Sequence, residues 1–416
     1  MYALVDCVSF YASCETVFRP DLRDSPILVM SNNDGCCVTL NEKAKALGFQ
    51  KFKPFYQLKP LIDHHQAIVF SSNYELYGWL SKQVMETLAT FASDHEVYSI
   101  DESWLDFTGH SDLRATGHEM IATVQQHTGL ATRVGFGSNK TLCKVASVVA
   151  KRVKAANGVC CIDDDGTQRR TILERFPVGQ VWGVGSKTAV KLNALGIHSA
   201  LELADYDKDS LRAQFGITVE RTARELNGQK CFNFYEDVVE QQQIIVSRSY
   251  AKPIYYLKPL QSITIGYLEK AMAKLRANNQ IVRHITFTAS TSRFSGNYQS
   301  IQNVITLPTH TSDTLTAARF VSMGIEQCYR RHKFVRSMVC LTGLRGNEYY
   351  QADLLEPEQS NASRELMKVI DAINAGNQKN IFLARSPKLT QWDMKREFKS
   401  PEYTTNWGDL PRIKCS

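Results

Sequence analysis

Short β-rich runs alternate with helical patterns through the first 160 residues, and this alternation restricts that part of the chain to an α/β or α+β fold. Strands are expected at 3–6, 27–31, 37–40, 96–100, 104–107 and 131–136. Helices are expected at 9–18, 42–47, 74–91, 111–127 and 140–154. This order predicts two βαββ-like passes with an insertion after the first helix.

The rest of the chain divides into a helical part and a second mixed part. Residues 166–228 show helical patterns with short loops, and Gly183 and Gly185 lie between two of the expected helices. After an acidic, Gln-rich linker at 236–243, the order β-α-β-β-α-β predicts a ferredoxin-like unit. The 416 residues are enough for several domains with cores of their own.

Positive charge is concentrated in that second mixed unit. The whole chain has 49 Lys and Arg against 42 Asp and Glu, a net charge of +7. Residues 241–350 alone have 14 Lys and Arg against four Asp and Glu, a net charge of +10. Arg248 and Arg293 are among the residues that would suit a phosphodiester backbone. Much of this charge lies on expected strands rather than on one amphipathic helix, which argues against a membrane surface.

Several function classes are excluded by motifs that the sequence lacks. It has no Gly-x-Ser-x-Gly and no His-Glu-x-x-His, and residues 135–141 lack the spacing of a phosphate-binding P-loop. Eleven Cys without a Cys-x-x-Cys suggest neither a disulfide framework nor a zinc site. The first residues resemble no secretion signal, so we expect the protein to work in the cytoplasm.

Three acidic residues stand where expected strands end or turn. Asp6 follows the first strand, and Asp101 and Glu102 lie between two later ones. If the first strand lies beside the strand that precedes Asp101, these carboxylates converge, and three oxygen donors suit Mg²⁺ with room left for substrate phosphates. Two such ions would activate an attacking hydroxyl and stabilise a leaving pyrophosphate. The alternative is structural, with a solvated turn at Asp101 and Glu102 and a helix cap at Asp6.

Three stretches resemble the palm motifs of Y-family translesion DNA polymerases, namely 6–15 (DCVSFYASCE), 99–103 (SIDES) and 137–147 (GSNKTLCKVAS). Two more, 391–397 (QWDMKRE) and 400–411 (SPEYTTNWGDLP), resemble more narrowly the UmuC type of this family. The resemblance extends over essentially the whole chain. It implies an α+β multidomain protein shaped as a right hand with a little finger. The implied parts are a palm (1–22 and 79–165), fingers (23–78), a helical thumb with a helix-hairpin-helix (166–235), the ferredoxin-like βαββαβ little finger (241–350) and a C-terminal tail (351–416).

The resemblance also implies roles for residues of the palm motifs. Asp6, Asp101 and Glu102 would be catalytic ligands of two Mg²⁺ ions, with Mn²⁺ as a substitute, and the Cys7 carbonyl would be a further donor. Tyr11 would be a steric gate whose ring clashes with a ribose 2′-hydroxyl. The residues expected to bind the incoming nucleotide are Phe10, Tyr11, Thr39, Lys45 and Lys151. Two departures from the family pattern are Val8, in place of Asn or Asp, and Leu40, in place of a basic residue.

For DNA, the resemblance and the charge pattern together suggest three sets of contacts. Lys140 and Lys144, one turn apart, would contact DNA phosphates, or else form a solvated helix face. Gly183 and Gly185 would form the hairpin of the helix-hairpin-helix, or else an ordinary turn. The third set, in the little finger, includes Arg248 and Arg293.

The function implied is error-prone, template-directed DNA synthesis across lesions in the SOS response, on primer-template DNA with dNTPs. Gln351, Leu354 and Leu355 resemble a sliding-clamp peptide, and a UmuD′-like dimer and a RecA-type recombinase filament are further expected partners on the nucleoid. The tail, with an apolar pattern at 366–373, is the expected place for partners. Two alternatives stay open: a DNA-binding accessory protein without catalysis, and another palm enzyme such as a cyclase. The cyclase leaves the thumb glycines and the basic unit unexplained.

Overall fold

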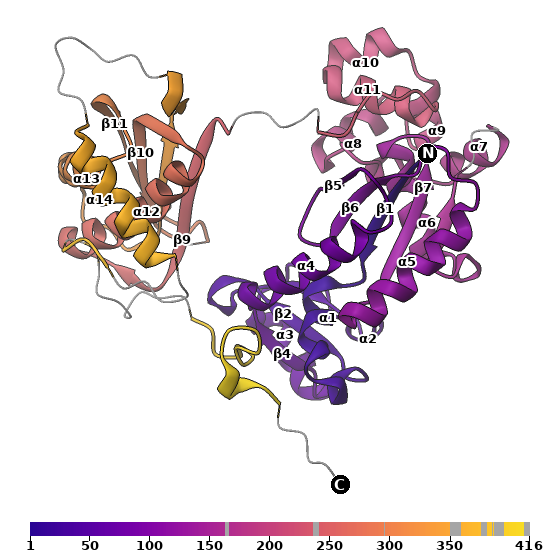
Figure 1. Ribbon diagram of the computed structural model, residues 1–416, viewed down its shortest axis with the longest axis horizontal. Coiled ribbons are helices and arrows are strands. Elements are labelled where there is room, and N and C mark those ends of the chain that lie inside the picture. The colour runs from indigo at the N-terminus through magenta and orange to yellow at the C-terminus, as the bar shows by residue number, and fades with distance from the viewer. Residues whose placement is uncertain are drawn as a thin grey trace. The chain divides into compact units, whose positions relative to one another are not determined.

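The computed structural model describes residues 1–162, 166–235, 241–294, 296–349, 359–375, 381–384, 386 and 395–411 (Figure 1). The chain forms two compact units. The first contains Met1–Ser31, Cys36–Val238 and Phe398–Ser416, and the second contains Asn32–Gly35 and Val239–Glu397. No helix among the described residues has the length and hydropathy needed to cross a bilayer.

A five-stranded sheet is the centre of the first unit. Its strands, in spatial order, are β5 (His95–Val97), β6 (Glu102–Asp106), β1 (Tyr2–Cys7), β7 (Thr132–Gly137) and β8 (Val159–Cys161). Strand β1 pairs antiparallel with both β6 and β7, and Figure 1 shows it between them. The core on one face is shared with the helices α1 (Phe10–Val17), α4 (Tyr74–Leu88) and α5 (Leu113–Thr128).

The opposite face of this sheet is covered by α6 (Lys140–Arg152), and two glycines allow the close approach. A Cβ at Gly135 would lie 2.3 Å from the Ser147 amide nitrogen, and one at Gly137 would lie 2.9 Å from the Cys143 amide nitrogen. Both contacts are with backbone, so neither can be relieved by a side-chain rotation. Gly135 and Gly137 of β7 therefore form a packing surface for α6.

One expectation about this sheet is wrong. The first strand does not pair with the strand before Asp101; it pairs with β6, the strand that begins at Glu102, and β5 pairs with the far side of β6. The strand expected at 96–100 is reduced to the three residues of β5, because the Tyr98 and Ser99 amides turn back to donate to the Glu102 carbonyl.

A smaller sheet has the order β3-β2-β4 and lies in the segment that the resemblance assigns to the fingers. Its strands are β2 (Ile27–Met30), β3 (Cys37–Leu40) and β4 (Ile68–Ser71), and its helices are α2 (Glu42–Ala46) and α3 (Phe55–His65). Strands β2 and β3 pair antiparallel as a hairpin, connected through Asn32–Gly35. Leu40 is 1% exposed and belongs to the core of this subdomain.

The helical part expected after residue 166 is confirmed as five α-helices that share one core. They are α7 (Thr167–Glu174), α8 (Ser186–Ala194), α9 (Ala200–Asp205), α10 (Lys208–Phe215) and α11 (Ile217–Leu226). A capping box at Ser199 and Glu202 begins α9, and Asp207 caps α10. These caps satisfy amides that the first turn of each helix leaves unpaired.

The second unit has the expected β-α-β-β-α-β order (Figure 1). Its elements are β9 (Gln243–Ile254), α12 (Leu257–Ala277), β10 (Gln280–Ser290), β11 (Ser300–Thr311), α13 (Thr314–Cys328) and β12 (Phe334–Thr342). The sheet order is β11-β10-β12-β9 with every neighbouring pair antiparallel, and the two-residue strand β13 (Arg345–Gly346) pairs antiparallel with the start of β10. Helices α12 and α13 cover one face, so the other face presents alternate strand residues to solvent.

The apolar pattern expected at 366–373 forms α14 (Asn361–Asn374), which packs on the second unit. The Arg276 guanidinium, on α12, donates two hydrogen bonds to Asp371, of 2.6 and 2.8 Å. Met367 is 1% exposed, whereas Leu366 and Val369 are 46% and 54% exposed. Part of the segment expected to bind partners is therefore held internally.

Candidate active site

The three acids meet at one end of the first sheet. Asp6 lies opposite Glu102 in the β1–β6 ladder. The Cys7 amide donates a 2.9 Å hydrogen bond to the Asp101 carbonyl, which joins the end of β1 to the turn before β6. Side chains directly opposite one another in a ladder lie on the same face, with Cβ atoms about 5 Å apart. The expected convergence of the acids thus occurs, through a different strand pair.

Burial and the nearness of the other two acids oppose the ionisation of Asp6. The pKa of Asp6 is raised from 3.8 to about 6, first by burial and then by the charges of Glu102 and Asp101. Lys151 and Lys144 act in the opposite direction. A divalent cation would remove the repulsion that raises this pKa, and the donors are hard carboxylate oxygens of the kind that Mg²⁺ prefers. The residue types therefore fit a magnesium site.

The side chains of Asp6, Asp101 and Glu102 are not gathered around one point as the ligands of a bound metal ion would be. Glu102 accepts hydrogen bonds of 2.9 and 2.8 Å from Lys144 Nζ, and Asp101 Oδ1 accepts one of 2.6 Å from the Ser99 hydroxyl. Across the described part of the chain, no group of three His, Cys, Asp or Glu side chains is gathered closely enough to hold a metal ion. Lys144, expected to contact DNA phosphates or to form a solvated helix face, is paired in the structure with Glu102.

Basic side chains lie beside the acid site. Burial lowers the pKa of Lys151, and the charges of Lys45 and Arg133 lower it further, whereas Asp6 raises it. Lys45 Nζ also lies 2.7 Å from Glu42 Oε1. The resemblance suggested Lys151 and Lys45; the structure places these two charges near each other, and the charge of Lys151 also acts on Asp6. No described contact joins Thr39, which lies in β3 opposite Val29, to the acids.

Arg133 is a site residue that the sequence reasoning missed. It lies in β7 directly opposite Asp6, on the side of β1 away from Glu102. The three side chains at this level of the sheet are therefore Glu102, Asp6 and Arg133, all on one face. The available signal was that Arg133 is the charged residue of an otherwise apolar expected strand. Its position needed the β1–β7 register, which the sequence does not reveal.

Tyr11 lies on α1 in a cluster of three tyrosine rings. Its ring stacks on Tyr77 of α4 with centroids 4.5 Å apart and an angle of 14°, and Tyr74 meets both rings edge-on at 6.1 Å. Burial raises the pKa of Tyr11. The ring of Phe10, a residue expected to bind the nucleotide, is 3% exposed and packs in the core beneath the sheet.

The buried carboxyl of Glu15 predicts a pH-dependent stability. Burial raises the pKa of Glu15 from 4.5 to about 7, and the nearby hydroxyls of Tyr77 and Ser400 offset part of that rise. A group whose pKa is higher in the folded chain stabilises the fold fully below pH 4.5 and loses this contribution as the pH rises through 7. The free energy of unfolding of Glu15→Gln, relative to the unchanged protein, should therefore increase by about 3 kcal/mol between pH 4.5 and pH 8.

Urea denaturation at several pH values measures this difference. Glu119→Gln, a change at an exposed site on α5, is the control and should show no such pH dependence. A constant difference between Glu15→Gln and the unchanged protein across the pH range would contradict the assignment of a neutral, buried Glu15.

Lys140 is buried and paired, which is neither the solvated helix face nor the free DNA-phosphate contact that the sequence suggested. Its side chain is 4% exposed and forms an ion pair of 2.9 Å with Glu96. Its ammonium group also donates to the Asn233 carbonyl at 2.9 Å and lies 4.9 Å from the centre of the Trp104 ring. A buried charge with this many partners joins β5, α6 and the segment after α11, and its removal would leave Glu96 unpaired.

The two glycines of the expected hairpin differ in their backbone requirements. Gly183 has φ +84°, which favours glycine, and a Cβ there would lie 3.2 Å from Thr222 Oγ1. Gly185 is the N-cap residue of α8 and makes no side-chain cap, with open space around it. The first amides of α8 are thus uncovered by a capping side chain, as a phosphate contact would need.

Exposed arginines of the second unit lie beside tyrosine rings. Arg293, in the β10–β11 loop, lies 5.9 Å from the centre of the Tyr298 ring, and Arg331 lies 5.3 Å from that of Tyr256. Arg248 lies on β9, half-buried, opposite Ser337 of β12. The expected clamp residues Gln351, Leu354 and Leu355 lie outside the described residues.

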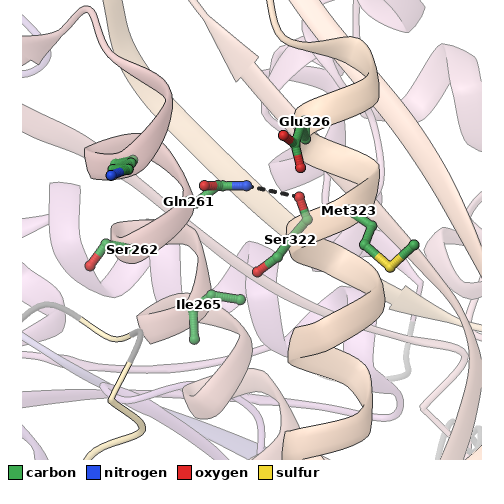
Figure 2. A pocket seen from close by; sticks show the side chains of 7 residues that line it. Gln261, Ser262, Ile265, Ser322, Met323 and Glu326 are labelled. Carbon is green, nitrogen blue, oxygen red and sulfur yellow. Dashed lines mark hydrogen bonds between the residues drawn. The ribbon is translucent and has the colours of Figure 1, made fainter.

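A hollow of about 410 Å³ lies between α12 and α13 (Figure 2). Gln261 Nε2 donates across it to the Ser322 carbonyl at 3.0 Å. Its charged lining residues are Lys258 and Glu326, one of each sign. This lining provides no group of acids or nucleophiles, and we assign the chemistry to the acid site.

Comparison with known proteins gives a family match over most of the chain. The impB/mucB/samB family model matches residues 5–148, and the model for that family's C-terminal domain matches residues 241–354. A domain of unknown function (DUF4113) matches residues 364–413.

Individual relatives give the same result. Protein UmuC of Salmonella typhimurium strain LT2 is 38% identical over 423 residues, covering 100% of both chains. DNA polymerase IV 1 of Bacillus subtilis strain 168 is 34% identical over 230 residues, 54% of each chain. The solved Y-family DNA polymerase chimera Dbh-Dpo4(243-245)-Dbh aligns with a TM-score of 0.66 at 22% identity, over 82% of this chain and 98% of that one, which supports the fold.

Proposed function

This chain belongs to the impB/mucB/samB family and is a DNA-directed DNA polymerase of the Y-family type, and from that we propose that it performs error-prone translesion synthesis on a primer-template. The observation that carries the proposal is the register of β1, which sets Asp6 between Glu102 and Arg133. Carboxylates for cations and a basic side chain for phosphates thus lie side by side at one level of the sheet.

The carboxylates of Asp6, Asp101 and Glu102, with the Cys7 carbonyl, are the groups that would hold magnesium in this proposal. When bound, two such ions lower the pKa of a primer 3′-hydroxyl and neutralise charge on a leaving pyrophosphate. Lys144 forms a 2.8 Å ion pair with Glu102, so that this carboxylate is paired rather than buried alone. The polypeptide thus keeps the ligand near its place of use.

Other side chains of the site bind and orient the nucleotide. Lys151, Lys45 and Arg133 supply positive charge for a triphosphate, whose in-line displacement depends on positioning and charge stabilisation. The Tyr11 ring, supported from behind by Tyr77, would lie under the sugar and exclude a 2′-hydroxyl. No residue is assigned as a general base.

Synthesis in the SOS response, on the nucleoid in the cytoplasm, belongs to the same proposal. The partners we propose are a sliding clamp, bound through Gln351, Leu354 and Leu355, a UmuD′-like dimer and a RecA-type recombinase filament. They follow from the family and from the sequence of the tail.

Primer extension tests the proposal against the alternative of an accessory protein without catalysis. Four primer-templates that differ only in the first template base are each offered all four dNTPs singly, with Mg²⁺ and the proposed partners. The polymerase should prefer the complementary dNTP on each template, and EDTA should stop the reaction while leaving DNA binding in place. An accessory protein would bind all four templates and extend none.

Salt dependence tests the proposed DNA contact of the second unit. Removal of one side chain that neutralises a phosphate should reduce the slope of log affinity against log salt by about 0.9 for duplex DNA. We expect this change for Arg293→Ala in the full-length protein, measured by fluorescence anisotropy with a duplex primer-template. Arg319→Ala, at an exposed site on α13, is the matched control, since it lies on the helix layer. An unchanged slope for Arg293→Ala would remove that residue from the DNA interface.

A further inference from the structure

The C-terminal part of the described chain returns to the first unit and joins the end of β4. The Ser71 amide donates to the Phe398 carbonyl at 3.0 Å, and the Phe398 amide donates to the Ser71 hydroxyl at 3.0 Å. Lys399 then forms a parallel bridge with Ser71. We call residues 398–403 the strap. It belongs to a region whose family model has no assigned function.

The strap contacts the start of α4 and the end of α1 through Ser400, Pro401 and Tyr403. The Asn73 side-chain amide donates to Ser400 Oγ at 2.9 Å and to the Pro401 carbonyl at 3.4 Å, while its oxygen caps α4. The Tyr403 ring stacks on Phe18 with centroids 4.7 Å apart. Ser400 is 5% exposed and Tyr403 is 8% exposed. Two side chains, Ser400 and Tyr403, therefore anchor the strap, while Pro401 and Glu402 between them are exposed.

Beneath the strap lies the buried pair of Glu15 and Tyr77, and Tyr77 contacts the proposed gate residue Tyr11. Glu15, on α1, is 1% exposed and accepts a 2.5 Å hydrogen bond from the Tyr77 hydroxyl. The hydroxyls of Ser400 and Tyr77 both favour the ionised Glu15 carboxylate. The Tyr77 ring in turn stacks on Tyr11 at 4.5 Å. The link from the strap runs through Asn73, whose carbonyl accepts a 3.0 Å hydrogen bond from the Tyr77 amide, so contacts connect Ser400 to Tyr77 and Tyr11.

We propose that the strap is a specificity-determining element, which holds the Tyr11 ring in place through Asn73, Glu15 and Tyr77. The inference rests on the proposed function, because it concerns the choice between dNTPs and rNTPs. A gate rejects a 2′-hydroxyl only if its ring cannot retreat from the clash. Tyr77 blocks that retreat, and Tyr77 is itself held by Glu15 and by the start of α4, both of which the strap covers.

The strap acts at a distance, so its residues are positioning residues. Without it, water would reach Glu15 and Asn73, and the α4 residues behind Tyr11 would gain freedom to move. Insertion of a dNTP does not need the clash, so its rate should change little. Insertion of an rNTP should become easier. A disruption of strap packing therefore has a selective signature that general destabilisation does not share.

The test measures kcat/KM for a dNTP and for the matching rNTP in the full-length protein. Tyr403→Ala should lower the dNTP to rNTP ratio by about 10-fold, mainly through faster rNTP insertion. Tyr403→Phe keeps the stack on Phe18 and should retain the ratio. Trp407→Ala, four residues further on at a site 89% exposed, is the matched control and should also retain it. Equal losses for both nucleotides, or an unchanged ratio in Tyr403→Ala, would overturn the proposal.

A second variant and a second readout keep the outcomes separable. If Tyr403→Ala does not fold, Ser400→Ala removes a single hydroxyl and should lower the ratio in the same direction; an unchanged ratio in that variant would overturn the proposal. Hydrogen exchange of the amides at 10–17 and 74–88 needs no catalysis and should accelerate in Tyr403→Ala but not in Trp407→Ala. If the unchanged protein inserts no nucleotide, the proposed function is wrong, and unchanged exchange in Tyr403→Ala would separately refute the positioning role.

Discussion

Replacing Asp101 with Asn is expected to slow nucleotide insertion by at least about 10³-fold, which corresponds to about 4 kcal/mol of transition-state stabilisation. Asn keeps the shape of the side chain and can still accept from the Ser99 hydroxyl, which lies 2.6 Å from Asp101 Oδ1. It removes one negative charge from the group that would hold the cations. The loss should therefore appear in the rate of insertion and not in the affinity for DNA.

Single-turnover insertion with bound primer-template measures that rate directly. Asp106→Asn, at the opposite end of β6, is the control, since Asp106 accepts from Thr108 and takes no part in the acid site. It should insert at the normal rate. If Asp101→Asn were as fast as Asp106→Asn, the three acids would not be the catalytic site.

Replacing Tyr11 with Ala is expected to raise rNTP insertion relative to dNTP insertion by about 10²-fold. The reason is geometric: Tyr77 stacks 4.5 Å behind the Tyr11 ring, so the ring cannot move aside to admit a 2′-hydroxyl. A binding site that offers only a loose apolar contact discriminates weakly against one added hydroxyl, and that weak discrimination is what Ala would leave.

Competition between labelled dCTP and CTP on one template base measures this ratio. Tyr56→Ala, at a site 73% exposed on α3, is the control and should preserve the normal preference for dCTP. A Tyr11→Ala protein that still rejected CTP as strongly as the unchanged protein would mean that another group acts as the gate.

The convergence of the acids was predictable from the sequence, whereas their neighbours were not. Acids placed at strand ends are expected to meet whenever those strands pair, and Asp6 and Glu102 do meet. The sequence favoured the wrong partner strand because period-two patterns show which face a strand buries and not which strand lies beside it. For the same reason Arg133, opposite Asp6 in β7, had no signal strong enough to single it out.

The burial of charged residues was a second feature that could not be predicted from the sequence. Lys140 and Lys144 are one turn apart on α6, a spacing that fits a solvated face or a DNA contact equally well. In the structure they are paired with Glu96 and Glu102, contacts between residues more than 40 positions apart. Helical periodicity describes one helix at a time, so it could not show that two acids from β5 and β6 face these lysines.

The strap was visible only as a motif. Residues 400–411 carried the resemblance to one type of the family, and the tail was expected to serve partners. The contacts of Ser400 with Asn73 and of Tyr403 with Phe18 depend on segments more than 300 residues earlier in the chain. No local pattern of hydrophobicity records such a contact, which is why the role of the strap required the structure.

The most direct test of the central claim is single-nucleotide insertion opposite an abasic site, with Mg²⁺, dNTPs and the proposed clamp, dimer and recombinase partners present. We expect the unchanged protein to extend the primer on both the abasic and the intact template. We expect Asp101→Asn to extend the primer on neither template. If the unchanged protein binds both templates but does not extend the primer on the abasic one, the assignment of a translesion polymerase would be contradicted.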